Sequence, residues 1–272
     1  MSTARTTELR ADCSAGTDGR ITFRLRLPQA EAGAAHPRLL LVLRPKKGRP
    51  EEASHVLGLE PGGDHLRAVL EPRPVLAEGR WDAYLLRGPD AGRERLRPGL
   101  RDLRLLVDGG ARQWTSPVAV RVPYATKDGF LALRAWRRTA HAEAGPIDIA
   151  DGAMTVRARL HGAELSGDAA VRLRLRGGGT EREYRPRPAG DGDFSFTVDY
   201  AELAEGTPGS RVWDAFLRPA AGAPPVRIGR LFDDVADRKG VYVYPRVTVG
   251  GAAVRPYYTV DNDLAVEVTA AG

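Results

Sequence analysis

The sequence repeats itself, and this internal repeat constrains the fold more than any other feature. Three blocks recur in the same order at an offset of 132 or 133 residues. The matched blocks are Ile21–Leu27 with Met154–Leu160, Trp81–Leu85 with Trp213–Leu217, and Pro123–Leu133 with Pro256–Val266. A chain of 272 residues is long enough for two domains that each bury a core. We therefore expect two tandem copies of one domain.

Apolar and polar residues alternate within the repeated segments, which predicts β-strands. Ile21–Leu27 alternates in this way, and so do Val171–Arg176 and Phe194–Val198. Further strands are expected at 39–43, 118–122 and 241–244, and turn residues separate the segments at short intervals. Asp128–Gly129 and Asp261–Asn262 each fit a tight hairpin turn, where central residues need positive φ. Short helices are expected only at 199–204 and 233–237. The pattern predicts an all-β chain made of two immunoglobulin- or fibronectin-like sandwiches.

The repeat also sets the expected domain boundaries. We expect a flexible tail over residues 1–16, a first sandwich over 17–137, a linker over 138–146 and a second sandwich over 147–272. The strand residues Trp81 and Trp213 recur at matching positions, so we interpret both as core anchors, with a sugar-stacking surface as the alternative.

The strand arginines are the most specific candidates for binding. The chain has a net charge of +6, and nearly all of its basic residues are arginine. Arg172, Arg174 and Arg176 alternate along one strand, so they share one sheet face, where guanidinium groups suit bidentate contact with phosphate. The alternatives are compositional bias and ordinary ion pairs with Asp and Glu. Trp114 and Trp136 have no counterpart in the second repeat and are candidates for stacking on a sugar.

Residues for catalysis or metal binding are not evident in the sequence. Cys13 is the only cysteine, which excludes an internal disulfide, and the five histidines are not spaced as metal ligands. Asp233 and Asp234 suggest a divalent-ion site only weakly, since their surroundings indicate a solvated loop. We expect no cofactor and no metal. The sequence shows no secretion signal and no membrane span, so we expect a cytoplasmic protein that is at most peripheral to the inner membrane face.

Several strings in the second repeat resemble a known class of accessory segment. They are Arg227–Leu231, Asp234–Lys239 and Arg255–Val266, together with the Trp-Asp-Ala block. They resemble the β-sandwich segments that follow the catalytic domain in actinobacterial glycosyltransferases and glycerophosphotransferases of the teichoic-acid type. The catalytic domain of that family has no counterpart here. The resemblance implies a stand-alone relative of the accessory part.

Three hypotheses follow for the function. The first is a non-catalytic binding or scaffolding protein in cell-envelope glycopolymer synthesis that engages an anionic glycopolymer or a partner transferase. The second is a transferase acting on activated sugar or polyol phosphate, with Asp233 and Asp234 at its site. The third is a homo-oligomerisation module that joins copies through sheet edges. Nucleic-acid binding is disfavoured, because the strand arginines alternate with core aliphatic residues rather than aromatics.

Overall fold

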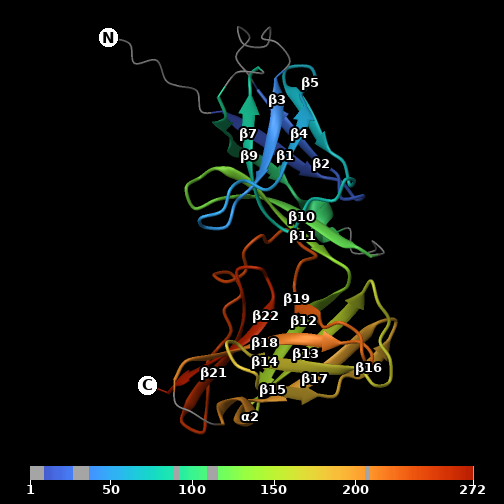
Figure 1. Cartoon of the computed structure of the whole chain (residues 1–272), viewed down its shortest axis with the longest axis vertical. Coiled ribbons are helices and arrows are strands. Elements are labelled where there is room, and N and C mark those ends of the chain that lie inside the picture. The colour runs from blue at the N-terminus through green and yellow to red at the C-terminus, as the bar shows by residue number, and fades with distance from the viewer. Residues whose placement is uncertain (1–8, 27–36, 89–91, 109–115, 206–208, 272) are drawn as a thin grey trace. The chain divides into compact units, whose positions relative to one another are not determined.

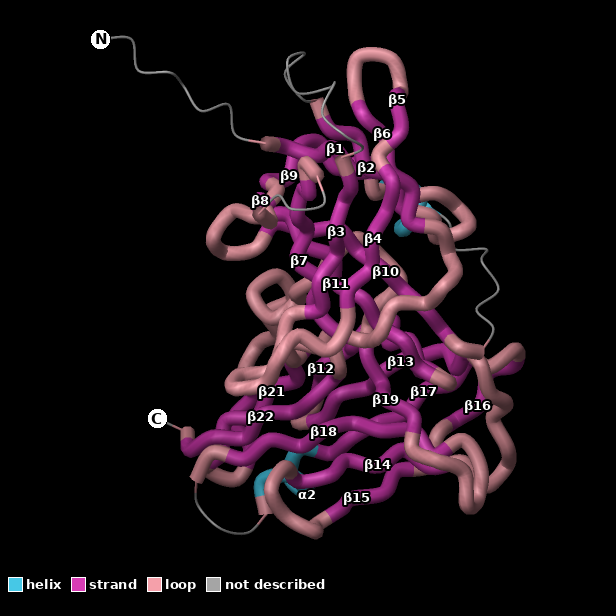
Figure 2. Tube along the Cα trace, turned by 45° about the horizontal axis from the view of Figure 1, so that its top comes forward, coloured by secondary structure: helices cyan, strands magenta, loops and turns pink. Residues whose placement is uncertain are grey.

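The chain is almost entirely β-structure, as the sequence predicted. The structure is a computed structural model that describes residues 9–26, 37–88, 92–108, 116–205 and 209–271. Strands account for 55% of the described residues and helices for 4% (Figures 1 and 2). The chain divides into two compact units. Unit 1 comprises residues 1–113, 119–137 and 232–236, and unit 2 comprises 114–118, 138–231 and 237–272.

Unit 1 contains two sheets among its described residues. The five-stranded sheet has the order β5-β6-β2-β1-β9, and the other has the order β10-β11-β7-β3-β4 with β8 paired to β7. The elements are β1 (Arg10–Ala15), β2 (Ile21–Leu25), β3 (Arg38–Leu43), β4 (Ser54–Gly58), β5 (Glu60–Pro61), β6 (Leu66–Leu70), β7 (Gly79–Leu86), β8 (Glu94–Arg95), β9 (Arg97–Asp102), α1 (Arg104–Asp108), β10 (Val118–Ala125) and β11 (Leu131–Arg138). The alternating residues Ile21, Phe23 and Leu25 are fully buried, so the predicted inward face of β2 is confirmed.

Unit 2 is also built almost entirely of strands among its described residues. Its described strands run in the order β16-β17-β13-β12-β19-β18-β22-β21-β20, and β14 pairs with β15 and β18. The elements are β12 (His141–Ala150), β13 (Ala153–His161), β14 (Ala170–Leu175), β15 (Glu181–Tyr184), β16 (Arg187–Gly190), β17 (Asp193–Asp199), α2 (Tyr200–Ala204), β18 (Arg211–Arg218), β19 (Val226–Gly229), β20 (Val247–Val249), β21 (Ala252–Tyr258) and β22 (Leu264–Ala270). Strand β19 pairs with both β12 and β18. It therefore joins one layer, formed by β12, β13, β16 and β17, to a second layer, formed by β14, β15, β18, β20, β21 and β22.

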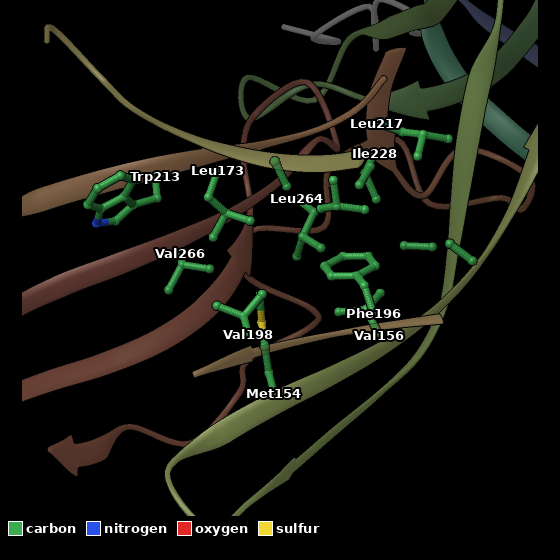
Figure 3. Packing of buried hydrophobic residues seen from close by; sticks show 14 of the residues in the cluster. Met154, Val156, Leu173, Phe196, Val198, Trp213, Leu217, Ile228, Leu264 and Val266 are labelled. Atoms are coloured by element: carbon green, nitrogen blue, oxygen red, sulfur yellow. The ribbon is translucent and has the colours of Figure 1, made fainter. Parts of the chain in front are cut away.

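The core of unit 2 lies between these layers. Figure 3 shows Met154, Val156 and Phe196 from one layer facing Leu173 and Val266 from the other. Each fully buried aliphatic or aromatic side chain of this kind contributes about 1.5–3 kcal/mol relative to an exposed one. Trp213 belongs to the same cluster and is 2% exposed, like Trp81 in unit 1. The core-anchor interpretation of both tryptophans is therefore confirmed.

Two predicted boundaries are wrong, and for the same reason. The expected tail contains β1, which pairs with β2 and β9, and the expected linker contains most of β12, which pairs with β13. The inward residues of these strands are small, namely Ala11, Cys13 and Ala15 in β1, and Ala142 and Ala144 in β12. Small side chains produce a weak alternation, so both segments lacked a strand signal.

Two local predictions also fail. Residues 241–244 form no strand, because the rings of Tyr242 and Tyr244 pack against Tyr258 while the backbone turns back to the carbonyl of Arg238. Residues 233–237 form no helix, because the carboxylate of Asp233 accepts a hydrogen bond from the backbone N–H of Val235 at 2.9 Å and fixes a turn. The predicted helix at 199–204 is confirmed as α2, with Asp199 as its N-cap.

The predicted hairpin turns are confirmed in both units. Gly129 and Asn262 both have positive φ, at 77° and 60°. In each turn the threonine backbone N–H donates to the residue four positions on, from Thr126 to Phe130 and from Thr259 to Asp263, at 2.8 Å in both cases. No helix in the described part of the chain is long or apolar enough to cross a bilayer.

Candidate functional site

The outer face of one unit 2 sheet gathers most of the candidate arginines. On β14, Val171 and Leu173 point into the core, so Arg172 and Arg174 point outward, and Arg176 follows directly after the strand. Four further strands or flanking segments add arginines to the same face. We call this surface the arginine face; it comprises Arg172, Arg174, Arg176, Arg218, Arg227, Arg246 and Arg255.

Carboxylates lie beneath and between these arginines. Arg172 pairs with Glu183 at 3.1 Å, and Arg174 pairs with Glu181 at 2.7 Å. Arg176 contacts Asp214 through Nη2 and Nε at 2.5 and 3.1 Å. All three predicted arginines therefore form ion pairs with acidic residues, which is one of the alternatives that the sequence left open.

Relative exposure differs from pair to pair: Glu183 is 54% exposed, more than its partners Arg172 at 31% and Arg218 at 24%, whereas the arginine is the outer charge at two other pairs. The side chain of Arg176 is 51% exposed, whereas Asp214 beneath it is only 15% exposed. Arg246 and Glu267 differ in the same direction, at 51% and 25%. Arginines also outnumber the carboxylates of this face, which are Glu181, Glu183, Asp214 and Glu267. A ligand approaching at Arg176 or Arg246 therefore meets the guanidinium group first.

Two aromatic rings lie among these arginines. Phe216 is half-buried on β18, with the guanidinium of Arg227 at 4.5 Å and that of Arg174 at 5.2 Å from its ring centroid. Tyr257 on β21 is half-buried and interacts electrostatically with Arg176. Burial raises the pKa of Tyr257, so its hydroxyl stays protonated at neutral pH and can donate. Guanidinium groups beside aromatic rings suit a ligand that carries both anionic groups and an apolar sugar or polyol face.

Sequence reasoning found the arginines but missed Asp214, Phe216 and Tyr257. These residues come from strands far away in the sequence, and the register that brings them beside β14 is Arg172 opposite Phe216 and Arg174 opposite Asp214. A usable signal was present, because Asp214 and Tyr257 both lie within the repeated blocks.

Of the two predicted stacking residues, the structure describes Trp136, and it does not join this site. Trp114 lies outside the described residues. Trp136 is 1% exposed, with the guanidinium of Arg134 at 5.1 Å from its ring centroid, so it presents no open face to a ligand. The stacking prediction for Trp136 fails because a large ring without a counterpart in the other repeat can still pack in the interior of its own unit.

The acidic pair considered for metal binding is not a compact site. Asp234, with Arg101, Arg104 and Asp108, lines an open cavity of about 600 Å³ in unit 1, and Asp233 is not part of the lining. No group of three or more His, Cys, Asp or Glu side chains among the described residues could hold a metal ion. Asp108 is the other acidic residue of this lining.

Comparisons with known proteins add only distant similarities. The sequence matches no protein-family model and no curated protein sequence. Among solved structures, the chain is similar to S. aureus TarS, at 14% identity and a TM-score of 0.29, over 68% of this chain and 34% of that one. It is also similar to residues 217–571 of S. aureus TarS, at 13% identity and a TM-score of 0.28, over 70% and 55% of the two chains. The chain thus spans about a third of the length of whole TarS.

Proposed function

We propose that this protein is a non-catalytic accessory protein of cell-envelope glycopolymer synthesis that binds an anionic glycopolymer through the arginine face of unit 2. The observation that carries the proposal is the row of Arg172, Arg174 and Arg176 with Phe216 beside it. Alternate residues on a strand are about 6.8 Å apart, so Arg172 and Arg174 leave the backbone at that spacing and Arg176 follows just beyond the strand end. The three side chains together offer several guanidinium groups to a chain of repeated anions. The resemblance of the second repeat to accessory segments of teichoic-acid-type transferases supports the same function.

The existing ion pairs do not prevent such binding. An exposed Arg–carboxylate pair contributes only about 0.2–1 kcal/mol, so its geometry shifts at little cost. Each guanidinium has five N–H donors, and a carboxylate that contacts two of its nitrogens leaves the remaining edge available. At Arg176, which contacts Asp214 through Nε and Nη2, a phosphate group can therefore bind on the Nη1 side without displacing the carboxylate. Arg172 contacts Glu183 through Nε and Glu181 through Nη1, so a phosphate group there replaces one of these carboxylates.

We also propose that the two units arose by duplication of one immunoglobulin-like sandwich. The sheet β10-β11-β7-β3-β4 of unit 1 has the same order as β21-β22-β18-β14-β15 of unit 2. The parallel pairing of β1 with β9 has its counterpart in β12 with β19. Corresponding pairs also share register, since Leu43 lies opposite Trp81 and Leu175 lies opposite Trp213. Matching strand order, strand direction and register support a common origin.

The test is retention of the purified full chain on isolated cell-wall glycopolymer at low and high salt. We expect retention at low salt that weakens as salt screens the charges. The variant with Arg172, Arg174 and Arg176 all changed to Gln should lose most of this retention. The matched control changes Arg157, Arg159 and Arg187 to Gln, which removes the same charge from exposed positions on the other sheet of unit 2.

Three outcomes are informative. Loss in the first variant with retention in the control supports the arginine face. Equal loss in both variants would reduce the binding to net charge and contradict a defined surface. Absence of retention at either salt would overturn polymer binding altogether, and a co-purifying transferase would then be sought as the partner.

A further inference from the structure

Each unit carries a similar cluster of three polar residues on its outer sheet face. In unit 1, Arg44 contacts Asp82 through Nη2 and Nε at 2.6 and 3.1 Å. In unit 2, Arg176 contacts Asp214 through the same two nitrogens at 2.5 and 3.1 Å. A tyrosine accompanies each cluster, since Tyr124 interacts electrostatically with Arg44, and Tyr257 with Arg176.

Backbone geometry places these residues at equivalent points of the two sheets. Both arginines follow directly after a strand and donate their backbone N–H to the neighbouring strand, Arg44 to the carbonyl of Arg80 at 2.7 Å and Arg176 to that of Val212 at 2.8 Å. The aspartates each follow the buried tryptophan and lie opposite alanines, Asp82 opposite Ala132 and Asp214 opposite Ala265. The likeness therefore extends beyond the residue types to their positions in the fold.

The arrangement orients each guanidinium for an external ligand. The aspartate occupies the edge formed by Nε and Nη2, so the Nη1 side of Arg44 and of Arg176 points away from the carboxylate. Burial raises the pKa of Tyr124 as well as that of Tyr257, so both hydroxyls are donors at neutral pH. A held guanidinium beside a phenol donor is suited to an oxyanion such as a phosphate or carboxylate group.

An aromatic ring and a second arginine accompany each cluster. Tyr84 lies opposite Arg95 in the ladder of unit 1, and Phe216 lies opposite Arg227 at the equivalent place in unit 2. Arg95 reaches Asp82 at 3.2 Å, which brings a second guanidinium to the unit 1 cluster. A ring beside paired guanidinium groups can contact the apolar face of a sugar or polyol while the arginines contact its anionic group.

We propose that the chain has two equivalent oxyanion sites, one formed by Arg44, Asp82 and Tyr124 and the other by Arg176, Asp214 and Tyr257. The inference rests on the proposed function and deepens it, because two like sites make the protein a bivalent reader of a polymer with repeated phosphate or carboxylate groups. Linking two sites on one chain raises overall affinity by about 10²–10⁴ over either site alone when both are engaged.

The experiment compares a single-anion probe with a polymer on the full chain. Isothermal titration with inorganic tripolyphosphate should show two sites per wild-type chain and one site in Arg44→Gln or Arg176→Gln. With isolated wall glycopolymer, either substitution should lower the apparent affinity by about 10²-fold or more, because it converts bivalent binding to monovalent binding. Arg157→Gln, which breaks an exposed pair with Asp148, is the matched control and should change neither quantity.

Milder variants separate binding from folding. Tyr124→Phe and Tyr257→Phe remove only the donor hydroxyls, so each should weaken tripolyphosphate at its own site while the free energy of unfolding stays unchanged. One tripolyphosphate site in the wild type, or wild-type polymer affinity in Arg44→Gln, would overturn the two-site inference while leaving the proposed function standing. Two tripolyphosphate sites without any polymer retention would instead contradict the proposed function and keep the sites.

Discussion

The corresponding sheet faces of the two units have opposite chemistry around one shared cluster. Arg172 and Arg174 in unit 2 occupy the ladder positions of Leu40 and Val42 in unit 1, and their partners Glu183 and Glu181 occupy those of Val56 and Ser54. Leu40 and Val42 are 4% and 3% exposed, whereas the side chain of Arg174 is 46% exposed. The Arg–Asp pair beside them is nevertheless present in both units.

This difference shows which parts of the face the fold requires. Residues that point inward are apolar in both units, because they fill the same kind of core. The outer positions differ, being aliphatic in unit 1 and ionised in unit 2, although strand order and register correspond. The Arg–Asp pair is therefore common to two faces whose other outer residues differ.

The largest expected effect concerns the shared core anchors. Trp81→Ala and Trp213→Ala should each destabilise their own unit by about 3–5 kcal/mol, because each removes a large buried ring. Hydrogen exchange after equilibration in urea would show which unit opens. Loss of protection confined to the mutated unit is expected, and equal loss in both units would contradict two separate cores.

A milder change at the same positions sharpens the comparison. The indole N–H of Trp81 donates to the carbonyl of Ala77 at 3.0 Å, whereas the described residues provide no hydrogen-bond partner for that of Trp213. Trp81→Phe should therefore cost about 1 kcal/mol more than Trp213→Phe, measured as the difference in free energy of unfolding. Equal costs would show that the two anchors are held alike.

Exchanging outer-face residue types between the two units should change the free energy of unfolding by unequal amounts. Leu40→Arg places a charge at a position with 4% exposure and should destabilise unit 1 by about 3 kcal/mol or more. Arg172→Leu loses only exposed ion pairs, so unit 2 should change by less than about 1 kcal/mol, with weaker polymer retention. Urea unfolding of both variants compares the two changes in free energy of unfolding, and Leu40→Met is the size-matched control. Similar changes in the two units would contradict the proposed contrast between the faces.

The two faces also show which features of the fold and of the site can be predicted from the sequence. The all-β class, the inward residues of β2 and the hairpin turns followed from alternation and turn chemistry, which are local properties. The first strand of each unit could not be predicted from these properties, since Ala11 and Cys13 in β1 and Ala142 in β12 give too weak a hydrophobic signal. Asp214 and Tyr257 were missed as site residues because strand register is a non-local property that no single segment encodes.

Acid pH should weaken unit 2 through a buried histidine. His141 is fully buried, with Glu143 at 2.8 Å from Nε2 and Arg138 at 3.2 Å from Nδ1, while Asp263 and His161 also act on it. Burial lowers the pKa of His141, so the folded unit holds it neutral. Below its unfolded pKa of about 6.5 the unfolded chain takes up a proton that the folded chain does not, so stability is full above that pH and falls as pH drops.

The measurement is urea unfolding of unit 2 at pH 7.5 and at lower pH, read by a hydrogen-exchange pulse at one fixed labelling pH. His141→Gln should flatten the pH dependence without abolishing it, because burial lowers the pKa of His161 too. His65→Gln changes a histidine of unit 1 that pairs with the exposed Asp64 and is the control. An unchanged slope in His141→Gln would exclude His141 as its source.

The smallest expected effect on stability comes from moving the single thiol, whose alkylation rate reports how often a unit opens. Cys13 is 2% exposed in β1, and burial raises its pKa to about 12, so alkylation at pH 8 requires unit 1 to open. Cys13→Ala should cost only about 1 kcal/mol, because it removes one small buried group. Adding Ala144→Cys to this variant places the thiol on β12, where Ala144 is 1% exposed. Alkylation rates of the two proteins then compare the opening of the two units, and trapping of either thiol in native buffer as fast as in urea would show that its strand is not part of a closed core.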